Sequence, residues 1–333
     1  MGRGLLKALV IGGTRNLGPG LVSSLVDAGF HVTVLHRGTT RASLPPAVEE
    51  IFADRSNESQ LVRVLRDRTF DVAVDMTLYN GKDAEVVSRL LDSKIRRYIM
   101  VSTGQVYLVR AGLERPFREL DYEGPTIAPP TNRFDYDNWL YGVDKRAAED
   151  VLMQAHKERK FPVTVLRLPM VNSERDHFGR IHGYLARLRD GGLILVPPEP
   201  HLPLRHVYGG DVVRVIVHLA RSDAGIGKAY NISQDETVTL HEFLRMLADF
   251  AGARLSTVTV PLERLMAEGL IPDCSPFSDP WMSAVDNRLS KKELGLAYTP
   301  LVTYLRVLVD HLSRISDAPA GYKRRKMELQ IKL

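Results

Sequence analysis

The amino-terminal half of the chain alternates short apolar runs with longer amphipathic segments. The apolar runs are residues 8–11, 31–36, 50–53, 71–76 and 97–103. Each run has the length of a buried strand, and the amphipathic segments between them are typical of helices. This alternation predicts an α/β fold with a doubly wound parallel sheet, in which ligands bind at the carboxyl ends of the strands.

A glycine-rich turn over residues 12–18 joins the first predicted strand to a helix that Gly29 ends. Such a turn directs backbone N–H groups and a helix N-terminus at one point, which suits a diphosphate. Gly13, Arg15 and Gly18 occupy the three glycine positions of the G-x-G-x-x-G fingerprint, so the middle glycine is replaced by arginine. The turn predicts a dinucleotide site from an incomplete motif.

The second predicted strand ends without a carboxylate. Dinucleotide sites usually place Asp or Glu there to bind the adenosine ribose, whereas an arginine accommodates the 2′-phosphate of NADP. This strand ends in His36 and Arg37, with Arg41 beyond it and Arg15 in the preceding turn. These side chains either form a solvated basic turn or indicate NADP as the cofactor, with NAD as the less favoured alternative.

Residues 110–138 contain several prolines and predict a long irregular loop that covers a site. A helix is expected from Tyr141 to about Lys160, followed by a sixth strand at 163–169. Tyr141 and Lys145 share one face of this helix, and an ammonium near a phenol lowers the pKa of the phenol. Thr103 ends the fifth strand and is placed to bond the same substrate oxygen. The three residues predict acid–base chemistry, with an exposed helix pair as the alternative.

The regular alternation breaks after Asn172, which predicts two domains and a tail. The Rossmann domain comprises residues 1–171 and 204–236, and a smaller α/β substrate domain comprises 172–203 and 237–320. Residues 321–333 are basic and are expected to be solvated or loosely docked. Capping boxes predict helix starts at Thr239 and at Ser290.

Composition adds limits on location and partners. The 333 residues carry a net charge of +5, which favours anionic partners, either nucleic acid or a phosphorylated cofactor and substrate. No apolar run approaches the ~20 residues of a membrane span, and no signal peptide is visible, so a cytoplasmic location without membrane attachment is expected. Cys274 is the only cysteine, and a buried, inert thiol is expected. The histidine spacing predicts no metal site.

Several motifs together resemble one family. Residues 12–18 are similar to a Gly-Gly-Thr-Gly-x-x-Gly turn, residues 102–107 to a Ser-Ser-x-x-Val-Tyr segment, and Tyr141-x-x-x-Lys145 to a catalytic pair. The segment 286–295 is similar to a Lys-x-x-x-Glu-Leu-Gly signature. Over roughly residues 6–310 the chain therefore resembles the extended or atypical short-chain dehydrogenase/reductases known as the NAD-dependent epimerase/dehydratase family.

The resemblance implies roles for individual residues. The catalytic residues would be Thr103, Tyr141 and Lys145. The implied cofactor contacts are Gly12, Thr14, Arg15, Asn16, Leu17, Gly18, Arg37, Asp54, Arg55, Thr77, Tyr141, Lys145 and Pro169. Gln105 and Arg205 are candidate substrate contacts, although the spacing from Arg205 to Asp211 does not fit the family pattern cleanly. A homodimer through two long helices is also implied.

Two functions remain open at this point. The first is an NADP-dependent oxidoreductase that acts on a hydroxyl or carbonyl carbon of a small molecule, either by net reduction or by epimerisation of a nucleotide-sugar-like substrate. The second is a member of the fold that has become an RNA-binding or regulatory protein. Nucleic acid binding is the less favoured function, because the basic residues are not interleaved with aromatic residues as a stacking surface requires.

Overall fold

The computed structural model describes residues 5–331, so residues 1–4 of the predicted Rossmann domain and residues 332–333 of the predicted tail lie outside the described residues. Its centre is a seven-stranded sheet in the order β10-β6-β5-β4-β1-β2-β3, in which every neighbouring pair is parallel. The strands are β1 (Leu6–Ile11), β2 (Phe30–His36), β3 (Glu49–Phe52), β4 (Phe70–Asp75), β5 (Ile95–Thr103), β6 (Val163–Leu168) and β10 (Lys228–Asn231). The predicted doubly wound fold is confirmed.

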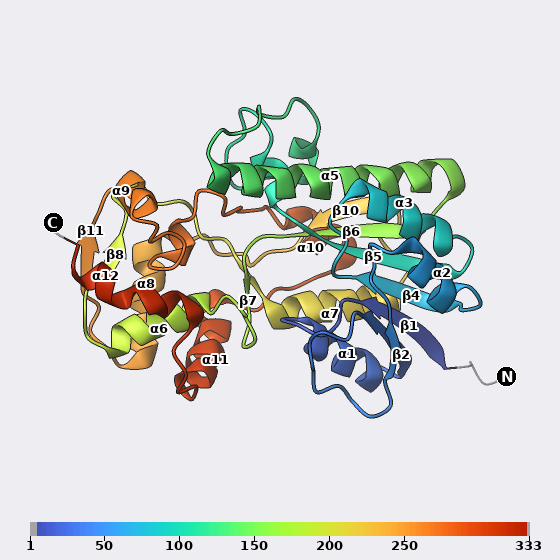
Figure 1. Ribbon diagram of the computed structural model, residues 1–333, viewed down its shortest axis with the longest axis horizontal. Coiled ribbons are helices and arrows are strands. Elements are labelled where there is room, and N and C mark those ends of the chain that lie inside the picture. The colour runs from blue at the N-terminus through green and yellow to red at the C-terminus, as the bar shows by residue number, and fades with distance from the viewer. Residues whose placement is uncertain (1–4, 332–333) are drawn as a thin grey trace.

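Helices cover both faces of the sheet (Figure 1). On one face α1 (Gly18–Asp27) and α7 (Gly209–Ala220) bury Leu21 and Ile216 against the strands. On the other face lie α2 (Glu58–Leu65), α3 (Gly81–Leu90) and α5 (Arg133–Arg159), which bury Leu61 and Leu152. Both faces of the strands are therefore apolar, as expected for a parallel sheet covered on two sides.

The helix α5 begins earlier than the sequence predicts. It starts at Arg133 rather than Tyr141, and the Asn132 side chain caps it by accepting a hydrogen bond from the Asp135 N–H at 2.9 Å. The predicted loop is correspondingly shorter and contains the 3₁₀ turn η1 (Glu119–Tyr122), and the short helix α4 (Gln105–Leu108) precedes it. Two further helical turns therefore stand between the loop and Tyr141.

A second lobe packs around its own apolar cluster at the other end of the molecule (Figure 1). Its helices and strands are α6 (Arg180–Arg189), β8 (Ile194–Val196), α8 (Leu240–Ala251), β11 (Thr257–Thr259), α9 (Leu262–Ala267), the 3₁₀ turn η2 (Pro276–Ser278), and α11 (Leu301–Ser313). The short pair β7 (Val171–Asn172) and β9 (Val207–Tyr208) joins the lobe to the sheet. The predicted domain boundaries stay a prediction. The helix α10 (Arg288–Leu294), which falls in the predicted substrate domain, contributes Leu294 to the apolar cluster beneath the sheet.

Only one of the two predicted capping boxes is correct. Thr239 caps α8 together with Glu242, as predicted. The helix α10 instead begins at Arg288, and Ser290 lies inside it with its hydroxyl donating to the Asn231 carbonyl at 2.8 Å. The serine is buried and serves a tertiary contact, which the local sequence does not reveal.

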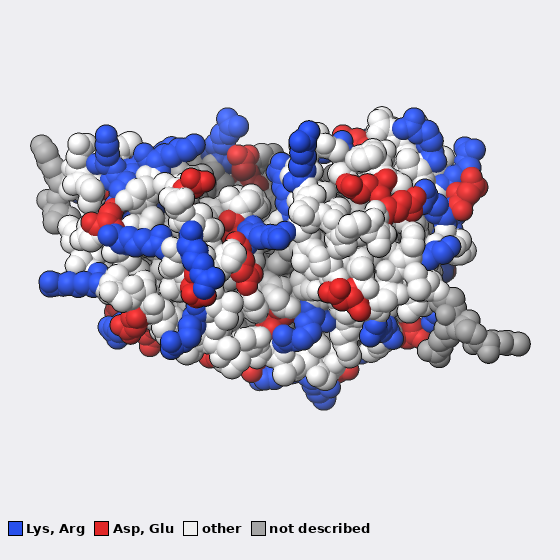
Figure 2. All heavy atoms as spheres, turned by 90° about the horizontal axis from the view of Figure 1, so that it is seen from below, with Lys and Arg blue, Asp and Glu red and all other residues white. Residues whose placement is uncertain are grey.

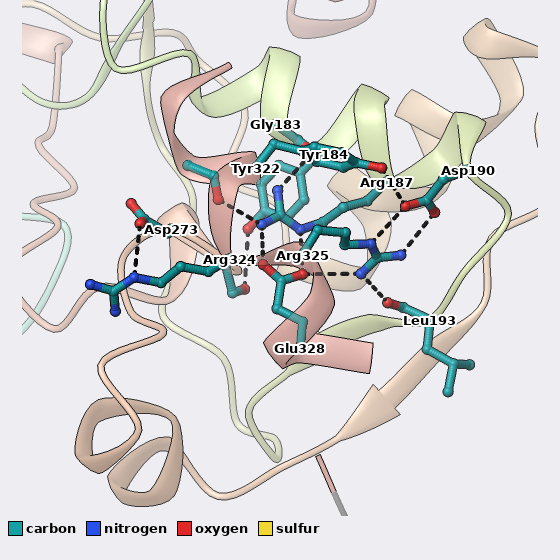
Figure 3. Close-up of polar contacts among 12 residues, drawn as sticks. Gly183, Tyr184, Arg187, Asp190, Leu193, Asp273, Tyr322, Arg324, Arg325 and Glu328 are labelled. Atoms are coloured by element: carbon teal, nitrogen blue, oxygen red, sulfur yellow. Dashed lines mark hydrogen bonds and ion pairs between the residues drawn. The ribbon is translucent and has the colours of Figure 1, made fainter. Parts of the chain in front are cut away.

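The carboxyl-terminal segment is docked, contrary to the prediction of a loosely attached tail. The 3₁₀ turn η3 (Ala320–Arg324) and α12 (Arg325–Leu329) lie against α6, and Arg325 and Glu328 are buried there (Figure 3). The prediction was wrong because Arg325 pairs with Asp190 and Glu328, and Glu328 pairs with Arg187 of α6, whereas the sequence shows only a charged run. None of the helices in residues 5–331 is long and apolar enough to cross a membrane.

Candidate active site

The turn between β1 and α1 has the geometry of a dinucleotide cradle. Gly12 has φ +87°, a left-handed backbone that favours glycine, and a Cβ on Gly18 would lie 2.4 Å from the Gly13 carbonyl carbon. The first turn of α1 therefore approaches the strand closely, and the N-terminus of α1 lies at the carboxyl end of β1. This arrangement fits a nicotinamide dinucleotide diphosphate at residues 12–18.

Several predicted cofactor contacts occupy this turn and its neighbour. Thr14 and Asn16 are partly exposed, and the Leu17 side chain is buried in the core, so only the backbone of Leu17 faces the turn. Thr77 packs against Gly12, where a Cβ would come within 2.3 Å of Thr77 Cγ2.

The edge of the sheet at β2 carries positive charge. Glu50 accepts from His36 Nε2 at 2.7 Å, so His36 is occupied by a neighbouring strand. Arg37 is exposed, and Arg15 extends away from the turn to donate to the Thr40 hydroxyl at 3.0 Å. Asp54 accepts two hydrogen bonds from Ser56, which lower the pKa of the carboxyl, and Arg37 lowers it further.

Arg55, a predicted cofactor contact, pairs with a carboxylate inside the protein. Its NH1 donates to both oxygens of buried Asp75 at 2.7 and 2.9 Å. Asp75 also accepts from the Tyr98 hydroxyl at 2.7 Å and from the Thr77 N–H at 3.0 Å. Because a buried carboxylate requires a counter-ion, Arg55 supports the loop that packs against Gly12, and its role as a cofactor contact stays a prediction.

A cavity of about 480 Å³ lies between the sheet and the second lobe. From the sheet side it is lined by Asn16, Thr103, Gln105, Tyr141 and Pro169. Five residues that the motifs assign to one site therefore meet in one cavity. Gln105 is held there by Asn138, whose Oδ1 accepts from Gln105 Nε2 at 2.9 Å.

Tyr141 is the candidate acid–base group of the cavity. Burial and the neighbouring Tyr79 phenol raise the pKa of Tyr141 to about 12, while hydrogen bonding with the Thr103 side chain lowers it. The Tyr79 and Tyr141 rings lie 6.4 Å apart between centroids. Tyr141 is therefore a neutral phenol at neutral pH in this structure.

Lys145 does not lower the pKa of Tyr141, contrary to the prediction. Its ammonium is buried and donates to the carbonyl oxygens of Leu78 and Val101, both at 2.8 Å. Burial lowers the pKa of Lys145 to about 8, and Glu149 and Asp75 oppose that effect. The two carbonyls orient the ammonium toward the strand ends, so sharing a helix face with Tyr141 is not sufficient for the expected coupling.

A buried polar network includes Glu149, whose negative charge lies near the Lys145 ammonium. Glu149 accepts from the Ser102 hydroxyl and from Arg167 Nε at 2.9 Å, and Arg167 NH1 donates to the Tyr107 hydroxyl at 2.8 Å. Because these groups come from β5, β6, α4 and α5, the network fixes the strand end that carries Thr103 relative to the helix that carries Tyr141.

The sequence analysis missed the second-lobe wall of the cavity and part of α5. Asn138 and Phe134 line the cavity one and two helical turns before Tyr141, and the Asn132 cap was the available signal for that extension. On the opposite wall, Asp279 and Trp281 follow η2, and Trp281 Nε1 donates to Asp135 at 2.7 Å. Loop residues of this kind leave no periodic pattern in a single sequence.

Arg205 does not line this cavity, and its role as a substrate contact stays a prediction. Its guanidinium donates to Asn287 Oδ1 at 2.9 Å and to the Ser233 hydroxyl at 3.3 Å. The loop beyond β10 and the start of α10 supply the acceptors that hold Arg205 there.

The docked carboxyl-terminal segment contributes to the cavity wall. Gly321 lines the cavity, and its carbonyl accepts from Arg187 NH2 at 3.3 Å. Arg187 also forms a fully buried ion pair with Glu328, while Arg325 Nε binds Asp190 at 2.7 Å. These pairs hold η3 and α12 against α6 and thereby place Gly321.

One group outside the cavity has the donor set of a metal site. Glu199, His201 and His241 each offer a ligand atom, and these atoms lie within 4.8 Å of one another. The Pro197 carbonyl accepts from His201 Nε2 at 3.0 Å, and His201 Nδ1 is buried without a hydrogen-bond partner among the described residues. The sequence spacing did not reveal the group because His241 comes from α8.

Cys274 is buried, as expected, and burial raises the pKa of its thiol to about 12, which disfavours the reactive thiolate.

A family model described as the NAD dependent epimerase/dehydratase family matches residues 8–233 of the chain. A 2′-dehydrokanamycin reductase of Streptomyces kanamyceticus is 24% identical over 324 residues, which cover 95% of this chain and 88% of the reductase. A chloroplast stem-loop binding protein of 41 kDa from Arabidopsis thaliana is 34% identical over 119 residues, which cover 31% of this chain and 30% of that protein.

Solved structures share the whole fold. A UDP-glucose 4-epimerase of Thermotoga maritima with UDP-glucose superposes with a TM-score of 0.70 at 19% identity, covering 93% of this chain and 99% of the epimerase. A UDP-glucuronic acid 4-epimerase of Bacillus cereus in complex with NAD gives a TM-score of 0.70 at 18% identity, covering 94% of this chain and 100% of that one. At these identities the likeness establishes the fold alone.

Proposed function

The chain belongs to the NAD-dependent epimerase/dehydratase family, and from that premise we propose that it transfers hydride between NADP and a hydroxyl or carbonyl carbon of a small molecule. Membership makes the chain a nicotinamide-dependent enzyme of the epimerase, dehydratase and reductase type. The observation that carries the proposal is one cavity lined by Asn16 of the glycine-rich turn together with Thr103 and Tyr141. A dinucleotide cradle and a proton donor therefore meet at the same carboxyl edge of the sheet.

The proposed roles follow from the donors present. Bound nicotinamide supplies or accepts the hydride at the substrate carbon. In the reducing direction, Tyr141 gives its hydroxyl proton to the carbonyl oxygen, so the carbonyl becomes a hydroxyl. In the oxidising direction, the Tyr141 phenolate accepts the hydroxyl proton. Thr103 bonds the same oxygen and holds it beside Tyr141, while Lys145, with two of its three N–H donors bound to carbonyls, has one left for a ribose hydroxyl.

Net reduction is supported over epimerisation by two observations. A phenol whose pKa is raised to about 12 remains protonated at neutral pH, which suits proton donation to a carbonyl. The relative that matches nearly the whole chain is a reductase, whereas the likeness to the epimerases concerns the fold.

The preference for NADP rests on charge at the end of β2. His36 stands where NAD sites usually carry a carboxylate, and Arg37 and Arg15 are exposed beside it. An arginine accommodates the adenosine 2′-phosphate that distinguishes NADP. Because related solved structures contain NAD, both nucleotides are to be measured side by side.

The test of the proposed chemistry is Tyr141→Phe, with Tyr136→Phe as the matched control. Tyr136 lies on the same helix with its side chain 40% exposed and is not part of the cavity lining. Loss of a general acid typically costs about 10²- to 10⁴-fold in rate. Tyr141→Phe should lose turnover with NADPH binding retained, and Tyr136→Phe should keep both. Unchanged turnover in Tyr141→Phe excludes the proposed role.

RNA binding is the second candidate function, favoured by the local identity to the stem-loop binding protein. On the face shown in Figure 2, however, Lys and Arg side chains are interspersed with Asp and Glu rather than joined in a single basic strip. RNA binding by phosphate contacts would weaken steeply with salt and would not require Tyr141. Salt-dependent RNA affinity that survives Tyr141→Phe, without any turnover by the wild type, would favour this alternative.

The homodimer implied by the family resemblance is also a proposal. The long helix α5 and its neighbour α3 lie side by side on one face of the sheet (Figure 1), where they are available to pair with a second copy. Sedimentation of the full chain at several concentrations measures its oligomeric state.

A further inference from the structure

The second-lobe wall of the cavity carries unbalanced negative charge. Its charged lining residues are Arg180, Asp273 and Asp279. Arg180 is already neutralised by Asp176, which accepts from its guanidinium at 3.1 Å and from its backbone N–H at 3.2 Å. The Arg180 guanidinium also stacks on Phe178, 4.4 Å from the ring centroid. Two carboxylates therefore line the cavity beside one paired guanidinium.

Asp279 is the carboxylate with no protein counter-ion. Its Oδ1 accepts the Trp281 N–H at 2.9 Å, and it forms no ion pair with any residue in the described range 5–331. Burial raises the pKa of Asp279, with Asp135 acting in the same direction and Arg180 opposing it. A partly buried, unpaired carboxylate is unfavourable by itself and gains from a cation placed next to it. Asp273, by comparison, has Arg324 at 4.0 Å.

Aromatic rings line the same cavity as this carboxylate. They belong to Phe134, Phe178 and Trp281. The negative faces of such rings attract ammonium groups and repel anions. Trp281 is fixed in place because Asp135 accepts its indole N–H. The cavity thus combines two features that favour a cation, an unpaired carboxylate and aromatic rings.

The same wall is unsuited to a diphosphate. Phosphate groups are usually held by unpaired arginines or lysines. Among the described residues that line the cavity, Arg180 is the one lysine or arginine, and Asp176 pairs it. Arg205, a candidate substrate contact from the sequence, is bound to Asn287 and does not line the cavity.

We propose that the substrate is an amine-bearing small molecule rather than a nucleotide sugar, and that Asp279 binds its ammonium group. The inference rests on the proposed function, because it assigns a substrate class to the cavity in which Tyr141 acts. Asp273 adds a second carboxylate at the same wall, and the aromatic rings cover the apolar surface around the ammonium. The carbonyl to be reduced then lies at the Tyr141 end of the cavity.

Titration calorimetry of the full chain, saturated with NADPH, tests the assignment with three probes. These are kanamycin, which carries several ammonium groups, the same molecule with its amines acetylated, and UDP-glucose. Kanamycin should bind, and acetylation should weaken binding at least tenfold because it removes the charge. UDP-glucose should bind more weakly than kanamycin. Asp279→Asn should weaken kanamycin binding at least tenfold, while Asp310→Asn, an exposed carboxylate on α11, should leave it unchanged.

Several outcomes overturn the inference: no kanamycin binding at millimolar concentration, equal affinity for the acetylated probe, tighter binding of UDP-glucose, or no effect of Asp279→Asn. NADPH affinity and the thermal midpoint report whether Asp279→Asn folds. If it does not, Asp273→Asn takes its place and must weaken kanamycin binding. Failure of the proposed function is distinguishable, because it appears as turnover retained in Tyr141→Phe whatever the probes do.

Discussion

Arg187 on α6 and Glu328 on α12 form an ion pair in which both side chains are fully buried. Removing one partner of a buried pair leaves an uncompensated charge, which typically costs about 3–5 kcal/mol. We therefore expect Glu328→Gln to lower the free energy of unfolding by roughly that amount. Denaturant unfolding measures it.

The control for this prediction is Asp310→Asn in the Arg314–Asp310 pair, whose side chains are 76% and 67% exposed. Water screens such a pair, so Asp310→Asn should change the free energy of unfolding by too little to resolve. If Glu328→Gln is as stable as the control, the buried pair does not hold the carboxyl-terminal segment.

Gly18→Ala should damage both folding and nucleotide binding. A Cβ at this position would lie 2.4 Å from the Gly13 carbonyl carbon, so the first turn of α1 must move away from the strand that it supports. NADPH affinity should fall at least tenfold, and the thermal midpoint should decrease. Both are measured on the purified chain.

Gly20→Ala is the matched control, because nothing lies within 4 Å of a Cβ there and the residue is inside α1. Alanine is favoured over glycine in a helix by up to about 1 kcal/mol, so this variant should be slightly more stable than the wild type. Equal NADPH affinity of the two variants would contradict the role of close packing at Gly18.

Arg37→Ala should discriminate between the two nucleotides. Hydrogen bonds to charged groups contribute about 1.5–3 kcal/mol, so losing a contact with the 2′-phosphate should weaken NADPH binding about 10- to 100-fold. NADH affinity should change less than about twofold, since it has no phosphate there. Fluorescence titration with each nucleotide measures both.

For Arg37→Ala the control is Arg96→Ala. Arg96 lies at the amino end of β5, on the edge of the sheet opposite the site, and its side chain is 69% exposed. The Arg96→Ala variant should bind both nucleotides as tightly as the wild type does. An equal loss of affinity for NADPH and for NADH in Arg37→Ala would show that Arg37 does not bind the 2′-phosphate.

Lys145→Met should remove a specific pH dependence of stability. Burial lowers the pKa of Lys145 to about 8, so between pH 8 and about 10.4 the unfolded chain binds the proton more tightly than the folded chain. Stability contributed by this group therefore increases as pH rises through that window. Relative to Lys145→Met, the wild type should gain about 3 kcal/mol across it.

Unfolding curves of wild type and Lys145→Met between pH 7 and pH 10.5 test this shift. Lys157→Met, an exposed lysine on the same helix, should follow the wild type at every pH. If the free energy of unfolding varies with pH in the same way for the wild type and for Lys145→Met, the Lys145 ammonium is not desolvated in the folded chain. Turnover should also fall in Lys145→Met, because the donor proposed for the ribose is lost.

The local sequence determined the elements and the catalytic end of the cavity. Strands, helices and the glycine-rich turn depend on spacing and backbone preferences within a few residues, which is why β1 to β6 and the meeting of Thr103 with Tyr141 could be predicted. The family motifs located the same residues independently. Asn132 is a local signal for the start of α5, but the prolines before it favour a loop, so the predicted start at Tyr141 is too late.

Only the tertiary structure decided how charged groups are paired and how far they are from water. Lys145 binds two backbone carbonyls, Arg55 binds Asp75, Arg205 is held by Asn287, and the basic carboxyl-terminal segment is anchored by Asp190 and by the Arg187–Glu328 pair. Each partner is distant in sequence. Because desolvation and ion pairing depend on what surrounds a group in space, no spacing along the chain specifies them.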